Sequence, residues 1–72
     1  MNRYKNSGGN SGVHAYEIGQ DYIVVWFNAG GKSYTYSYGK AGRQHVENMK
    51  ELAINGQGLN SYIMKNVAKM FD

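Results

Sequence analysis

Residues 33–38 alternate strictly between a hydroxyl side chain and a tyrosine, in the order Ser-Tyr-Thr-Tyr-Ser-Tyr. A period of two is typical of a β-strand that buries one of its faces. Residues 22–28, just upstream, read YIVVWFN, and β-branched and aromatic side chains of this kind are favoured in strands. Gly30 and Gly31 lie between the two segments and can supply the positive φ angles of a tight turn. These features predict an antiparallel hairpin.

A turn centred on Gly30 and Gly31 also predicts the hairpin register. The expected cross-strand pairs on the core face are Phe27 with Tyr34, Val25 with Tyr36, and Ile23 with Tyr38. The opposite face would carry Tyr22, Val24 and Trp26, bordered by Ser33, Thr35 and Ser37. Because a slip of one residue would mix the two sets, the pattern itself supports this separation of faces.

The segments around this hairpin predict a small α+β domain. Residues 13–18 are expected to form a first strand with His14, Tyr16 and Ile18 on one face, followed by a turn at residues 19–21. Residues 1–12 are polar and glycine-rich, so we expect a flexible N-terminal arm there.

The hydrophobic period changes to that of a helix after Tyr38. Val46, Met49 and Ala53, widened by Leu52, predict a helix over residues 40–54. Residues 55–58 read Asn-Gly-Gln-Gly and should end it, with a positive φ angle at one or both glycines.

A second helix is expected to begin at Asn60 as its N-cap and to run to Phe71. Its apolar stripe would consist of Ile63, Val67, Met70 and Phe71. The predicted fold is therefore a three-stranded antiparallel β-meander followed by two short α-helices packed on one face. Residues 13–72 would form this single domain.

The length and composition limit the classes of protein to consider. A chain of 72 residues is long enough for one domain. It contains no cysteine, which excludes a disulfide framework and a cysteine zinc site. No apolar run approaches the roughly 20 residues of a membrane helix, and residues 1–12 lack the apolar segment of a signal peptide. We therefore expect a cytoplasmic protein.

The order of several short motifs resembles the KTSC domain family, a small domain found at the C-terminus of some lysyl-tRNA synthetases and as free-standing bacterial proteins. The similar residues are Tyr34-Thr35-Tyr36; Tyr16-Glu17; Ile23, Val25, Phe27 and Gly31; and Val46, Leu52, Ala53, Gly58, Leu59, Asn60 and Ile63. The resemblance covers residues 16–71. It implies a small domain of unknown activity, for which the synthetase context suggests RNA binding.

The sheet face that carries Tyr22 and Trp26 is the candidate ligand surface. Aromatic rings on such a face can stack on unpaired bases. Lys32, Lys40 and Arg43 are the candidate phosphate contacts, and the formal net charge of +3 is compatible with an acidic ligand. We therefore expect a small non-catalytic binding module, with RNA as the leading ligand.

The same face is open to a second interpretation. An apolar patch formed by Tyr22, Val24 and Trp26 would also suit a protein partner, or a second copy of this chain. The sequence leaves both alternatives open.

The sequence gives little reason to expect catalysis. His14 and His45 are the two histidines, and the chain has no nucleophile elbow, HExxH motif, phosphate loop or paired-carboxylate spacing. Two histidines without cysteines make a poor zinc site. We expect no enzyme, no metal site and no cofactor, and we expect His14 on the core face as a structural histidine.

Overall fold

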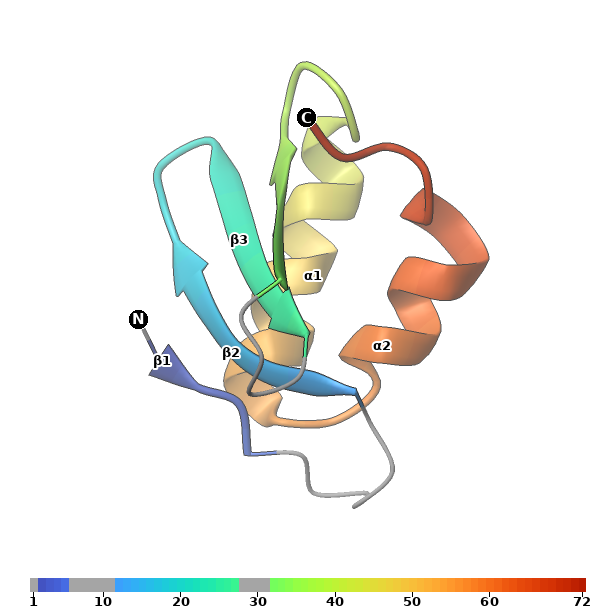
Figure 1. The fold of residues 1–72 in the computed structure, drawn as a ribbon. Coiled ribbons are helices and arrows are strands. Elements are labelled where there is room, and N and C mark those ends of the chain that lie inside the picture. The colour runs from blue at the N-terminus through green and yellow to red at the C-terminus, as the bar shows by residue number, and fades with distance from the viewer. Residues whose placement is uncertain (1, 6–11, 28–31) are drawn as a thin grey trace.

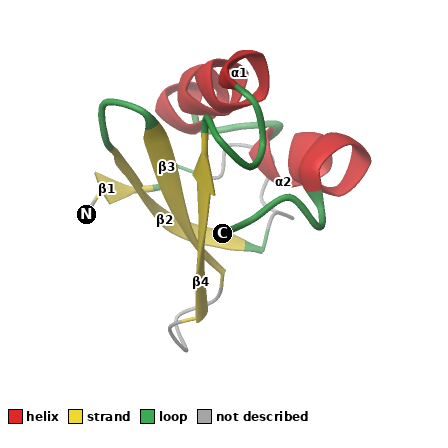
Figure 2. Cartoon of the chain, turned by 90° about the horizontal axis from the view of Figure 1, so that it is seen from above, coloured by secondary structure: helices red, strands yellow, loops and turns green. Residues whose placement is uncertain are grey.

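The computed structural model describes residues 2–5, 12–27 and 32–72, and these form an α+β fold. A four-stranded antiparallel sheet in the order β1-β2-β3-β4 is covered on one face by the helices (Figures 1 and 2). The elements are β1 (Asn2–Arg3), β2 (Val13–Ile18), β3 (Tyr22–Phe27), β4 (Lys32–Ser37), α1 (Arg43–Asn55), α2 (Leu59–Tyr62) and the π-helical turn η1 (Ile63–Val67) that continues α2.

The strand β1 was not expected, so the prediction of three strands is wrong by one. Asn2 pairs with Tyr16 and Arg3 with Ala15, at the edge of the sheet. Tyr4, which follows, is only 3% exposed, and its hydroxyl accepts a hydrogen bond from the Leu59 amide at 3.2 Å. Residues 2–5 therefore belong to the domain and not to a flexible arm. Residues 6–11 of that predicted arm lie outside the described part of the chain.

The register between β3 and β4 differs from the prediction by two residues. Val25 pairs with Tyr34 and Ile23 with Tyr36, whereas the expected partners of these tyrosines were Phe27 and Val25. The turn at residues 28–31 lies outside the described residues. A shift of two keeps every side chain on its predicted face, because side chains alternate with a period of two. The predicted separation of the two faces is thus confirmed although the pairing is wrong.

A β-bulge in β2 overturns the prediction for His14. Val13 pairs with Phe27 but Ala15 pairs with Trp26, so the register shifts between them. A bulge adds one unpaired residue and reverses the alternation on its far side. As a result Val13 points into the core in place of His14, and the His14 side chain is exposed.

Two glycines with left-handed backbone separate the helices, as predicted. The φ angles of Gly56 and Gly58 are 80° and 83°. The Gly56 amide donates to the carbonyls of Leu52 and Ala53, which closes the end of α1. A β-carbon on Gly56 would lie 2.4 Å from Cβ of Lys5, so glycine is also what lets the N-terminal segment cross here.

The helix boundaries differ from those expected. The first helix begins at Arg43, because residues 38–41 form a turn in which the Ala41 amide donates to the Ser37 carbonyl at 2.8 Å. The second begins at Leu59, with Gly58 at the N-cap position, so the prediction of Asn60 as the N-cap is wrong.

The end of the chain does not continue the second helix. Helical backbone ends at Val67, and the last residues cross from the second helix toward β4 (Figure 1). The Asp72 amide donates to the Thr35 carbonyl, and the Ser37 hydroxyl donates to Oδ1 of Asp72, both at 2.7 Å. Met70 and Phe71 are therefore not part of a buried helical stripe, and they are 43% and 39% exposed.

The core lies between the helices and the covered face of the sheet, and every side chain in it is apolar or aromatic. The buried cluster consists of Tyr4, Val13, Ile23, Val25, Tyr36, Ala41, Val46, Met49, Ala53, Leu59, Ile63 and Val67. Tyr16, Ile18, Phe27, Tyr34, Tyr38, Leu52 and Tyr62 pack against its margin. The described residues bury no charged side chain.

The position of Tyr4 predicts that the N-terminal segment is part of the cooperative unit. Tyr4→Phe should lower the free energy of unfolding by about 1–2 kcal/mol, because the buried Leu59 amide loses its acceptor. Tyr4→Ala should cost about 3–5 kcal/mol, as for other truncations of large buried aromatic side chains. Urea denaturation followed by circular dichroism measures both.

The control is Arg3→Ala, at an exposed neighbouring position, which should change stability by less than about 0.5 kcal/mol. If Tyr4→Ala unfolds at the same urea concentration as Arg3→Ala, residues 2–5 do not contribute to the core.

Candidate functional site

The face of the sheet that the helices leave uncovered carries a row of three large side chains. Tyr22, Val24 and Trp26 share this face on β3, an inner strand, and they are opposite Ser37, Thr35 and Ser33 of β4. Figure 2 shows both helices on the other side of the sheet. All three side chains of the row are partly exposed. We call this surface, defined by Tyr22, Val24 and Trp26, the open face.

The turn that precedes β3 holds one ring of this row in place. A β-carbon added to Gly19 would lie 2.1 Å from the Tyr22 ring, so the ring packs directly over the glycine. Since strand residues rise about 3.3 Å each, the Tyr22 and Trp26 backbones are about 13 Å apart. The open face therefore offers two separate aromatic surfaces with Val24 between them.

The five residues predicted to bind a ligand do not lie on one surface. Tyr22 and Trp26 share the open face, as predicted. Lys32 pairs with Phe27 and so projects from the helix-covered side. Lys40 is exposed in the turn after β4, and Arg43 begins α1 with its guanidinium 5.8 Å from the Tyr38 ring.

Two charged residues that the sequence reasoning did not select border the open face. Arg3 pairs with Ala15, which pairs in turn with Trp26, so all three project from the same side. Glu17 pairs with Val24 and lies on this side as well. Arg3 was missed because residues 1–12 were expected to form a flexible arm. Glu17 could have been found, because it alternates with Tyr16 and therefore lies on the other face of the sheet.

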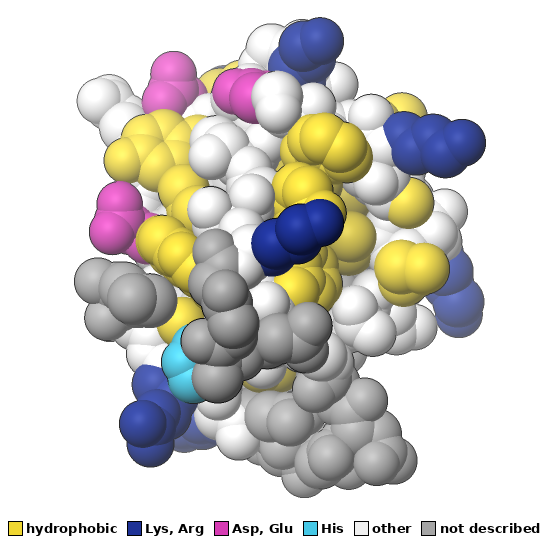
Figure 3. Space-filling model, viewed as in Figure 1, with side chains coloured by type: hydrophobic (Ala, Val, Ile, Leu, Met, Phe, Trp, Pro, Cys, Tyr) yellow, Lys and Arg dark blue, Asp and Glu magenta, His cyan; other side chains and the backbone are white. Residues whose placement is uncertain are grey.

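A groove lies on the helix-covered side, between β4 and the second helix. It has a volume of about 350 Å³ and is lined by Phe27, Lys32, Tyr34, Tyr36, Asn60, Ile63, Met64, Ala68 and Phe71. Figure 3 shows hydrophobic side chains gathered in this region, with a basic side chain lying across them. The sequence did not predict the groove, because one wall comes from Phe71 in the returning end of the chain. We call it the Lys32 groove.

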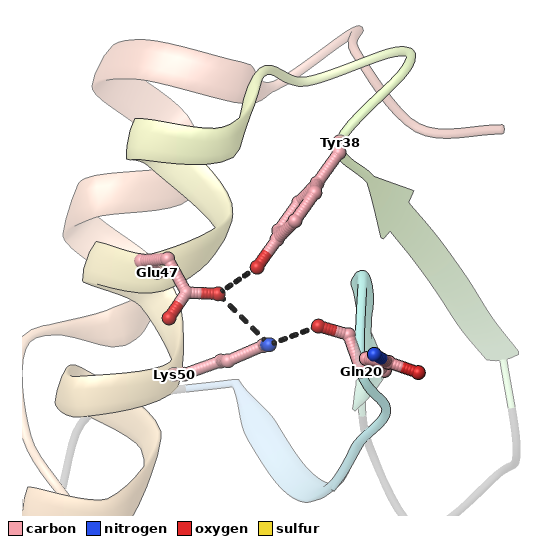
Figure 4. A network of polar contacts seen from close by, with 4 residues as sticks. All are labelled: Gln20, Tyr38, Glu47 and Lys50. Atoms are coloured by element: carbon pink, nitrogen blue, oxygen red, sulfur yellow. Dashed lines mark hydrogen bonds and ion pairs between the residues drawn. The ribbon is translucent and has the colours of Figure 1, made fainter.

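A polar network ties α1 to the sheet at the opposite side of the domain (Figure 4). The Tyr38 hydroxyl donates to Oε2 of Glu47 at 2.5 Å, and Nζ of Lys50 lies 2.9 Å from the same oxygen. Lys50 also donates to the Gln20 carbonyl at 3.1 Å. The network links the turn before β3, the end of β4 and the helix, which is a structural role.

The hydrogen bond from Tyr38, together with the contact to Lys50, holds the pKa of the Glu47 carboxyl below its ordinary value. The same hydrogen bond raises the pKa of Tyr38, because the phenol must keep its proton to donate it.

The second histidine takes part in a polar contact between the two helices. Nδ1 of His45 lies 2.6 Å from the Tyr62 hydroxyl, to which Nδ2 of Asn48 donates at 3.1 Å. The tautomer of His45 determines which of the two groups donates in the His45–Tyr62 hydrogen bond. The contact fixes the angle between α1 and α2.

Two classes of site find no support in the part of the chain that is described. Within residues 2–5, 12–27 and 32–72, no group of three His, Cys, Asp or Glu side chains could hold a metal ion. No helix among these residues is long and apolar enough to cross a membrane.

Comparison with known proteins gives no relative. No family model, no curated protein and no solved structure matches the chain. The resemblance to the KTSC family stays a prediction from the motif order.

The Glu47 network predicts a loss of stability in acid. The pKa of the Glu47 carboxyl is lowered in the folded protein. The ionised carboxylate therefore stabilises the fold above its ordinary pKa of 4.5, and this stabilisation is lost as the pH falls below that value. The thermal midpoint of Glu47→Gln should therefore fall less between neutral pH and about pH 3 than that of the wild type. Glu51→Gln removes an exposed carboxylate from the same helix and is the matched control. Equal acid sensitivity of Glu47→Gln and the wild type would contradict the network's role.

Proposed function

We propose that the protein is a small non-catalytic binding module that takes single-stranded RNA on its open face. The observation that carries the proposal is the uncovered row of Tyr22 and Trp26 on an inner strand of a sheet whose other face is filled by helices. Sheets of this kind bind unpaired bases by stacking them on aromatic side chains. The module would need no cofactor.

Stacking suits the spacing of the two rings. Each stacked base contributes about 1–3 kcal/mol and requires no particular sequence, since every base has a π face. The separation of about 13 Å along β3 leaves Val24 as an apolar floor between the two bases. Ser33 and Thr35 on the neighbouring strand offer hydroxyls to the sugar and phosphate groups.

The charges around the open face favour weak binding with few phosphate contacts. Arg3 lies toward the Trp26 end of the row. At the other end Tyr22 pairs with Ser37, and Lys40 is exposed in the turn that follows Ser37. Glu17 borders the centre of the face and repels phosphate there. Two phosphate contacts give a slope of about −1.4 for log K against log salt with a single strand.

The mixed charge of this border supports a second candidate, a protein-interaction surface or homodimer interface. Protein interfaces often combine an aromatic centre with a polar rim that contains arginine. Trp26, Tyr22 and Val24 would be the centre, and Arg3 and Glu17 part of the rim. For either candidate, the absence of cysteine suits the reducing cytoplasm, where we place the activity.

Titration with a single-stranded oligoribonucleotide tests the first candidate, because Trp26 is the one tryptophan of the chain and its fluorescence reports the open face. We expect quenching at micromolar RNA in low salt, with a salt slope of about −1.4. Tyr22→Leu should weaken binding by about 1–3 kcal/mol, because the leucine keeps an apolar contact with Gly19 but cannot stack.

Charge variants separate phosphate contact from general basicity. Arg3→Gln should reduce the salt slope by about 0.7, whereas Lys65→Gln, on the exposed side of the second helix, should leave it unchanged. Unchanged Trp26 fluorescence at high micromolar RNA in low salt rules out RNA binding. A dimer in sedimentation equilibrium that Tyr22→Leu dissociates would establish the second candidate in its place.

A further inference from the structure

Most side chains that line the Lys32 groove are aromatic or aliphatic, and Lys32 and Asn60 are the polar exceptions. The ring centroids of Tyr34 and Phe71 lie 4.7 Å apart, and those of Phe27 and Tyr34 lie 5.6 Å apart. Phe71 also meets Tyr36 edge-on at 6.5 Å. These four rings form the floor and one side, and the facing wall consists of Ile63 and Met64 of the second helix and Ala68 just after it.

Two of the four large apolar side chains that the described residues expose line the groove. Met64 is 66% exposed and Phe71 is 39% exposed, and both line it. Trp26 on the open face is less exposed than either of them. Contiguous exposed apolar surface of this kind commonly marks a binding site.

The charge distribution of the groove is one-sided. Lys32 is the one charged side chain among the described residues that line it, and no carboxylate is present among them. Burial, reinforced by the neighbouring Tyr34, raises the pKa of Tyr36 to about 12, so the Tyr36 phenol is uncharged at neutral pH. An anionic group beside Lys32 would meet no nearby charge of its own sign in the groove.

We propose that the Lys32 groove binds a small amphipathic carboxylate, with its hydrocarbon body between Tyr34 and Ile63 and its carboxylate at the Lys32 ammonium. The volume of about 350 Å³ lies at the lower end of the range for small-molecule sites. An apolar floor with one cation at its margin matches a ligand with one charged end. A neutral hydrocarbon would leave Lys32 unused, and a multiply charged ligand would have to bury charge against the aromatic rings.

Octanoate is a suitable probe, and octan-1-ol is its uncharged counterpart of equal chain length. A ligand of this size in a preformed groove should bind with a Kd of about 1 mM. Titration followed by NMR should shift the methyl resonances of Ile63, Met64 and Ala68, while the Trp26 indole resonance on the other face stays unchanged. Octan-1-ol should bind about three- to tenfold more weakly, because it forms no ion pair.

Two variants test the charge and the shape separately. Lys32→Gln should weaken octanoate binding about three- to tenfold without changing octan-1-ol binding, and Lys65→Gln should change neither. Ala68→Leu fills the groove from an exposed position and should weaken both ligands at least about tenfold. Asn66→Leu adds the same side chain outside the groove and is the control for it.

The outcomes that overturn the proposal are distinct from those that bear on RNA. Methyl resonances that stay constant at several millimolar octanoate show that the groove is not a site. Equal affinity for octan-1-ol, with no effect of Lys32→Gln, overturns the assignment to a carboxylate. Octanoate that dissociates a dimer in sedimentation would show that a second copy fills the groove. Tyr22→Leu, which tests the open face, should leave octanoate binding unchanged.

Discussion

The helix-covered face of β3 is the surface on which the rest of the molecule is assembled. Ile23 and Val25 have no exposed surface, and α1 and the second helix place Val46, Met49, Leu59 and Val67 in the same core. Helices of 13 and 9 residues would be marginal in water by themselves. Their stability depends on this shared burial. A domain of this size has one such surface to offer, which leaves the second face of the sheet uncovered.

The separation of the two sheet faces could be predicted from the sequence because it depends only on the alternation of side chains along each strand. The alternation at residues 33–38 survives a register error of two, so Trp26 is on the open face and Tyr36 is buried, even though Tyr36 does not have its predicted partner. The register itself depends on the turn, where two adjacent glycines allow more than one loop. The position of His14 could not be predicted either, since nothing in the sequence of β2 announces a bulge.

The alternation of β4 also determines the face on which one candidate ligand residue lies. Lys32 alternates with Tyr34 and Tyr36, so it belongs to the covered side and cannot join Tyr22 and Trp26. The remaining differences concern contacts between residues far apart in the chain. Tyr4 is buried through a hydrogen bond to Leu59, 55 positions away, and Phe71 reaches Tyr34 only because the chain turns back after Val67. A lone tyrosine in a polar segment has no periodicity from which such a contact could be predicted.

The two ends of the described chain lie along the two opposite margins of the sheet. Asn2 and Arg3 pair with one outer margin through β2, and the Asp72 amide bonds to the Thr35 carbonyl on the other. Unpaired amides and carbonyls at a sheet margin are templates for strand addition by another chain, and short polar or charged segments block it. Residues 2–3 and Asp72 thus occupy part of each margin. Removing residues 2–3 or Asp72 would therefore expose backbone groups to which another chain could add a strand.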